Sequence, residues 1–164
     1  MTRLIGGLDR FVAVILSCGS WLLLPVVLLL FLQWPLRDIF RAWSRDANDL
    51  GQWMFALYVA MAFTAATRAH THLAADALAR HYSERTRATL ARLGALLALL
   101  PWSLYTIIGG ASLVISSLRS LEAFADTYNP GYFIIKLALW LLAGLVLAQA
   151  IIDIARPRAG ATDA

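Results

Sequence analysis

The sequence predicts an all-α integral membrane protein with four transmembrane helices. Four long apolar runs fill most of the 164 residues, at about 11–36, 50–67, 93–118 and 132–152, and none has a charged residue at its centre. Each run holds about 18 to 26 residues, which at about 1.5 Å per residue is enough to cross a hydrocarbon core about 30 Å thick as a helix. The composition agrees, because 60% of the residues are hydrophobic and only 15% are charged, against about 25% charged in an average soluble domain.

The first run is expected to stay in the protein as a span and not to be cleaved as a signal peptide. Arg3 and Arg10 flank its start, and residues 15–18 loosely resemble a lipoprotein cleavage site. The apolar part of a signal peptide is about 7–15 residues long, whereas this run continues through Leu30 without a break. Cys18 is the only cysteine, which excludes a disulfide within the chain, and we expect it to be a small buried apolar side chain.

Basic residues predict the orientation of the spans. Nine of them lie on the side that carries both termini and the middle connection: Arg3, Arg10, Arg68, Arg80, Arg85, Arg87, Arg92, Arg156 and Arg158. The five on the other side are Arg37, Arg41, Arg45, Arg119 and Lys136, balanced by Asp38, Asp46, Asp49, Glu122 and Asp126. The positive-inside rule therefore places the termini and the middle connection in the cytoplasm. The net charge is +4. The basic side chains behind it orient the chain and contact anionic lipid, so the charge does not indicate a nucleic-acid partner.

The segment at about 71–87 differs in character from the spans on either side of it. Leu73, Ala77 and Tyr82 can share one helical face while Asp76 and Arg80 point elsewhere, which predicts a short helix lying in the headgroup region. An ordinary solvated loop is the alternative. On this basis residues 1–164 form a single four-span membrane domain.

Small residues and prolines are the informative features within the spans. Small residues recur every fourth position at Ala56, Ala60 and Thr64, at Gly94 and Ala98, and at Gly144 and Ala148. This spacing favours close helix contacts, either within the chain or with another protein. Pro25 and Pro101 lie mid-span and are expected to bend their helices.

Missing residue types restrict the function. Carriers and proton relays keep ionisable side chains at mid-depth, and none is found there. The Ser and Thr side chains of the spans can bond backbone carbonyls instead of lining a pathway. The histidines, His70, His72 and His81, all lie in the middle connection, so no haem, metal or other cofactor site and no catalytic group is predicted. The sequence therefore indicates neither an enzyme nor a self-sufficient transporter.

Two short motifs carry a resemblance to a known family. The first span ends in Arg37, and Trp43, Asp49 and Leu50 lead into the second span, which is followed by Arg68, His72 and Asp76. This order resembles the small membrane subunit, DctQ-like, of tripartite ATP-independent periplasmic (TRAP) transporters, and residues 128–132 are similar to some members. Two departures exist: Asp49 stands where Glu is commoner, and Ala74-Ala75 replaces the usual basic and β-branched pair.

The resemblance implies a division of labour among three proteins in a bacterial inner membrane. A soluble periplasmic protein captures an organic acid, a large permease subunit carries the sodium and substrate sites, and this chain is the scaffold beside it. We expect Asp49 to cap the second span and to reach Arg37 or Arg41. His72 and Asp76, four residues apart, are expected to fix the interfacial helix.

Two other functions remain open at this stage. A membrane structural or assembly protein that forms its own homo-oligomer would use the small-residue stripes against copies of itself. A small exporter is less compatible with the sequence, because the predicted spans of this chain contain no acidic residue.

Overall fold

The protein is described by a computed structural model at residues 2–39, 45–69 and 82–155. Its helices are α1 (Thr2–Ser20), α2 (Leu23–Asp38), α3 (Arg45–Ala69), α5 (Glu84–Gly94), the π-helical η1 (Ala95–Leu99), α6 (Leu100–Gly109), α7 (Ala111–Arg119) and α8 (Tyr132–Ala155). Four stretches are long and apolar enough to cross a membrane: Arg3–Pro35, Arg45–Ala69, Thr89–Gly109 and Tyr132–Ala155. These findings confirm the predicted all-α, four-span fold class.

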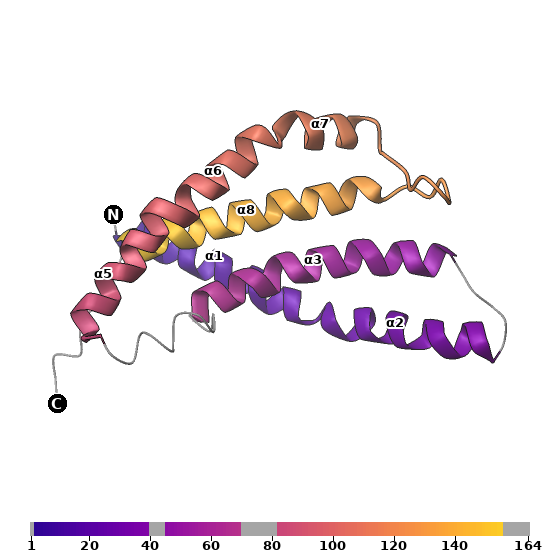
Figure 1. Ribbon diagram of the computed structural model, residues 1–164, viewed down its shortest axis with the longest axis horizontal. Coiled ribbons are helices and arrows are strands. Elements are labelled where there is room, and N and C mark those ends of the chain that lie inside the picture. Colours follow the sequence, from indigo (N-terminus) through magenta and orange to yellow (C-terminus); the bar gives the residue numbers. More distant parts are fainter. Residues whose placement is uncertain (1, 40–44, 70–81, 156–164) are drawn as a thin grey trace.

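Two helical hairpins lie side by side, with α3 of the first against α8 of the second (Figure 1). Helix α2 flanks α3 on one side, α6 and α7 flank α8 on the other, and α1 contacts both α3 and α8. The start of α1 and the end of α3 lie at one end of the bundle, which we name the terminal end. The opposite end, which carries residues 120–131 and the start of α3, is named the loop end.

Irregular turns precede both prolines that were expected to bend their helices. The α-helical hydrogen bonds are interrupted at Trp21 and Leu22, four and three residues before Pro25, where both N–H groups bond the carbonyl three residues earlier. A proline lacks an N–H and its ring collides with the carbonyl four residues earlier, here that of Trp21. In the third span, Leu97, the corresponding residue for Pro101, lies inside η1. A π-helical turn there accommodates the missing hydrogen bond without ending the helix.

Small side chains form much of the core along α8. Ala138, Ala143, Val146 and Ala150 are buried there, and Ala60 and Thr64 of the predicted α3 stripe are buried as well. Gly94 and Gly144 behave differently, because both are exposed and an added Cβ at either would meet nothing within 4 Å. Only the α3 stripe therefore lies in the core of this chain.

Helices α1 and α3 lie close together at Gly19. A Cβ added there would lie 2.5 Å from Sδ and 2.8 Å from Cβ of Met61, so only glycine allows this approach. Cys18, the preceding residue, is exposed. The expectation that it is buried is wrong, because the glycine and not the cysteine turns toward α3.

The predicted interfacial segment falls largely outside the described residues, which omit 70–81 and with them His72 and Asp76. Its last residues, from Glu84 on, belong to α5. Ser83 caps this helix, since its Oγ accepts the N–H of Thr86 at 3.3 Å and so bonds one of the free amides at the helix start. The helix then continues through η1 into the third span.

Candidate functional site

Asp49 lies in the second turn of α3, at the loop end, because α3 begins at Arg45. It is only 7% exposed. The expectation that Asp49 caps the second span is wrong, since four helical residues precede it. The charged and amide side chains between Arg45 and Asn48 allow the helix to begin before the apolar run. The free backbone N–H groups at the start of the helix therefore lie one turn before the Asp49 carboxylate.

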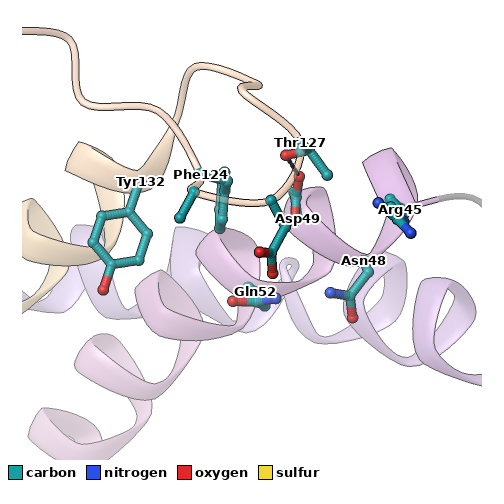
Figure 2. A pocket seen from close by; sticks show the side chains of 9 residues that line it. Arg45, Asn48, Asp49, Gln52, Phe124, Thr127 and Tyr132 are labelled. Carbon is teal, nitrogen blue, oxygen red and sulfur yellow. Dashed lines mark hydrogen bonds between the residues drawn. The ribbon is translucent and has the colours of Figure 1, made fainter.

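The Asp49 carboxylate holds the connection between α7 and α8 (Figure 2). The Thr127 hydroxyl donates to Oδ2 of Asp49, and Nδ2 of Asn129 donates to the same oxygen at 3.3 Å. The Asn129 amide also donates to Asp46, one turn earlier on α3. Two carboxylates of the first hairpin thus bind two neutral donors of the second. We name these four residues, Asp46, Asp49, Thr127 and Asn129, the loop clamp.

The connection itself, residues 120–131, has a defined backbone. The Phe124 N–H donates to Asn129 O at 2.9 Å, and the Tyr128 N–H donates to Phe124 O at 2.9 Å. Tyr128 and Gly131 have φ values of 57° and 137°, and the second is accessible almost only to glycine. These turns present Thr127 and Asn129 to α3. Tyr128, Asn129 and Gly131 belong to the 128–132 stretch that carries part of the family resemblance, whereas Phe124 and Thr127 precede it.

Aromatic packing closes the loop against both hairpins. Phe124 is buried and meets the Tyr132 ring edge to face, with centroids 5.5 Å apart. A Cβ on Gly131 would lie 3.5 Å from the Trp53 ring and 3.6 Å from the Phe124 ring. Both distances are ordinary van der Waals contacts, and Trp53 belongs to α3, so Gly131 lies next to the first hairpin.

A second carboxylate anchors the loop to its own hairpin. Glu122 accepts hydrogen bonds from Nζ of Lys136 and from the Ser117 hydroxyl. The Lys136 bond, followed by the Ser117 bond, lowers the pKa of Glu122 below its ordinary value despite partial desolvation. The sequence pattern predicts for Glu122 and Lys136 only that their charges balance on one side of the membrane. Lys136 is the only lysine of the chain and lies inside an apolar run, which is a signal for a fixed partner.

A recess of about 500 Å³ opens beside the loop clamp. Figure 2 shows its lining from both hairpins: Arg45, Asn48, Asp49, Gln52, Phe124, Ala125, Asp126, Thr127 and Tyr132. Amide, carboxylate and guanidinium groups face a space that can take polar side chains of another protein. Among the residues that the structure describes, no three His, Cys, Asp or Glu side chains are grouped to hold a metal ion.

Two other predicted residues, Arg37 and Arg68, are described by the structure, and neither lies at this site. Arg37 forms an exposed ion pair with Asp38, Nε to Oδ1 at 2.9 Å; Arg41 and Trp43 lie outside the described residues. Arg68 lies at the terminal end, where Nη2 is 2.6 Å from Oδ1 of Asp9. Of the predicted residues that the structure describes, Asp49 is thus the one that lines the recess.

Two buried hydroxyls of the spans bond carbonyls of their own helices, whereas the buried Gln149 donates Nε2 to Asp153 Oδ1 at 3.1 Å and its Oε1 has no partner among the described residues. The Thr64 hydroxyl donates to Ala60 O at 3.0 Å, and the Ser103 hydroxyl donates to Leu100 O at 2.9 Å. Their polarity is therefore satisfied without a solute, and they do not indicate a pathway.

Comparison with known protein families identifies the family of this chain. The family model described as "Tripartite ATP-independent periplasmic transporters, DctQ component" matches residues 26–160. The chain belongs to the DctQ family. This confirms the resemblance drawn from the motifs, and it makes the chain a small multi-pass membrane subunit of a TRAP transporter. The DctQ family is a family of transporter components. Comparisons with curated proteins and with solved structures give no match.

Proposed function

We propose that this DctQ subunit is the stationary scaffold of a large permease subunit that takes up organic acids with sodium. A periplasmic binding protein delivers the acid, and the permease carries both the sodium and the substrate sites. This chain contributes no covalent chemistry, cofactor or solute site. Its 164 residues act as one membrane domain in the bacterial inner membrane, surrounded by lipid and its partner.

The observation that carries this proposal is the distribution of charge along the helices. In the described part of the four spans, ionisable side chains lie near the two ends, such as Asp9 and Arg68 at one end and Asp49 and Lys136 at the other. A solute or sodium pathway requires such groups at depth. A bundle with an apolar middle and tied ends is suited to resist the load from a neighbouring domain that moves.

The orientation proposed from the basic residues places the loop end in the periplasm. The recess beside the loop clamp then faces the binding protein when it docks on the permease. Its mixed acidic, basic and amide lining supports transient polar contacts, because such groups steer association without requiring a large apolar interface. Cysteine labelling of the loop end with a membrane-impermeant reagent tests this orientation.

Reconstitution tests the proposal directly. Liposomes that contain the permease subunit, this chain and the loaded binding protein should accumulate the organic acid when a sodium gradient is imposed. Liposomes with this chain alone should be inert, and omission of this chain should abolish or strongly reduce uptake. Uptake by the chain alone would contradict the proposal, as would full uptake in its absence. Purification as a homo-oligomer that does not bind the permease would support the structural or assembly protein instead.

A further inference from the structure

The recess beside the loop clamp carries more negative than positive charge. Asp49 and Asp126 line it with carboxylates, against the single guanidinium of Arg45. In the described part of the chain, no basic side chain forms an ion pair with either carboxylate. Two further lining residues, Asn48 and Gln52, have amide oxygens that can also accept hydrogen bonds. The recess is therefore complementary to a cation.

One carboxylate oxygen of Asp49 is left for such a partner. Both donors of the loop clamp that reach Asp49 bond its Oδ2, and no described group donates to Oδ1. Oδ1 is not among the described side-chain atoms that are buried without a hydrogen bond, so solvent reaches it from the recess. The residue is only 7% exposed and has neutral donors alone. A cation at Oδ1 would offset the cost of burying its charge.

The size of the recess favours a basic side chain over a metal ion. Its volume of about 500 Å³ lies in the range of pockets that hold whole ligands, about 300–1,000 Å³. A hard metal ion instead needs several oxygen ligands within about 2.6 Å, and the described residues contain no group of three His, Cys, Asp or Glu side chains for such a site. A lysine or arginine side chain fills more of the space and donates several hydrogen bonds.

The polarity of the lining indicates a soluble partner. Charged and amide groups are unfavourable beside lipid tails, so the recess faces water. A lasting membrane partner is expected against the apolar faces of the spans, because obligate interfaces are mostly hydrophobic. A protein that binds and leaves relies more on complementary charge, which speeds its association. The loop clamp also forms the recess before binding, which lowers the cost of ordering it.

We propose that the recess receives a lysine or arginine side chain of the periplasmic binding protein, whose charged group donates to Oδ1 of Asp49 and lies beside Asp126. This inference rests on the function proposed above, which brings the binding protein to the loop end. It adds the chemical group by which the two proteins recognise each other.

The affinity of the loaded binding protein for the purified complex of this chain with the permease tests the recess. Asp126 is exposed, so Asp126→Lys should leave the melting temperature unchanged. It should raise the dissociation constant roughly tenfold, mainly through slower association. Asp38→Lys is the matched control, because Asp38 is an exposed carboxylate at the same end of the bundle and outside the recess.

At about 150 mM salt, where distant charges are screened, Asp38→Lys should change the dissociation constant by less than about twofold. Equal effects of the two variants would overturn the proposal, as would an unchanged affinity in Asp126→Lys. If the wild-type complex does not bind the loaded binding protein at all, the proposed function itself fails, so the two failures are distinguishable.

Asp49→Asn tests the free oxygen. The variant loses the charge but keeps one oxygen that can accept from Thr127, and the dissociation constant should rise roughly three- to tenfold. If Asp49→Asn does not fold, the Asp126→Lys measurement decides. When the lysines and arginines of the binding protein are replaced by glutamate one at a time, one variant should restore binding to Asp126→Lys. The absence of any such variant would overturn the assignment to a basic side chain.

Two further results would assign the recess to another occupant. Saturable heat on titration of the full chain with sodium or calcium chloride, lost in Asp49→Asn, would indicate a metal ion. Loss of the permease subunit from the Asp126→Lys complex, or a changed number of copies of this chain in it, would place a membrane neighbour in the recess. Either result would overturn the proposal.

Discussion

The two ends of α3 are fixed in different ways. At the loop end, the buried Asp49 carboxylate accepts from two neutral donors that lie about 80 residues later in the chain. At the terminal end, Arg68 pairs with Asp9, and their side chains are 31% and 22% exposed. The first contact joins the two hairpins, whereas the second joins helices α1 and α3 of one hairpin.

The difference shows which contact sets the arrangement of the hairpins. An ion pair that water partly reaches contributes little and is screened by salt. A carboxylate that is only 7% exposed and has fixed donors is costly to disturb, because its removal leaves partly buried donors without that partner. We therefore expect stability and partner binding to depend more on the loop end than on the terminal end. The predictions below test this expectation, from the largest effect to the smallest.

Gly131→Ala should have the largest effect. At φ 137° an alanine is strained, and its Cβ would lie against the Trp53 and Phe124 rings, so we expect a loss of about 2–3 kcal/mol. Thermal unfolding in detergent measures it. Gly51→Ala, on α3 where a Cβ meets nothing within 4 Å, is the control and should be neutral or slightly stabilising. Equal melting temperatures for the two variants would show that the loop does not need this backbone geometry.

Asp49→Ala should follow, with a loss of about 2 kcal/mol, because it leaves the Thr127 hydroxyl without its acceptor and removes one of the two acceptors of the Asn129 amide. Uptake by the reconstituted transporter should fall as well. Asp38→Ala removes an exposed pair with Arg37 and should change stability by less than about 0.5 kcal/mol. If Asp38→Ala is the more damaging of the two, the loop clamp does not join the hairpins.

Arg68→Ala should cost about 1 kcal/mol or less, since the Asp9 pair is partly exposed. The loss should shrink when sodium chloride is raised from 50 mM to 500 mM, whereas the loss in Asp49→Ala should not. The charge-exchanged variant with Asp9→Arg and Arg68→Asp should recover part of the loss. If the stability loss in Arg68→Ala did not depend on salt, the Arg68–Asp9 pair would stabilise the protein in the same way as the loop clamp, and the prediction would be wrong.

The smallest effect is expected from pH acting on Glu122. Its pKa is lowered in the folded protein by Lys136 and Ser117, so the unfolded chain binds a proton more readily. The stabilisation is therefore complete above about pH 4.5, the ordinary value, and it is lost as the pH falls through the folded pKa. The melting temperature of Glu122→Gln should vary less over this range than that of the wild type. Identical pH profiles would show that the Lys136 bond does not contribute.

The sequence alone located much of this structure. Run length and the absence of central charge predicted four spans, because a membrane helix must satisfy its own backbone and needs about 20 apolar residues. Pro25 and Pro101 marked the interruptions for an equally local reason. The order of Arg37, Asp49 and Arg68 pointed to the family, since it depends on position along the chain and not on contacts.

The tertiary structure decided which side chains meet. Asp49 could be assigned to a cap or to Arg37 from spacing alone, whereas its observed donors, Thr127 and Asn129, come from the other hairpin and are presented by a loop with unusual backbone angles. The rotation of each helix likewise placed Gly19 against Met61 and Tyr105 on the outside. Apolar membrane helices show little difference between their faces in sequence, so only packing against neighbours determines which side is covered.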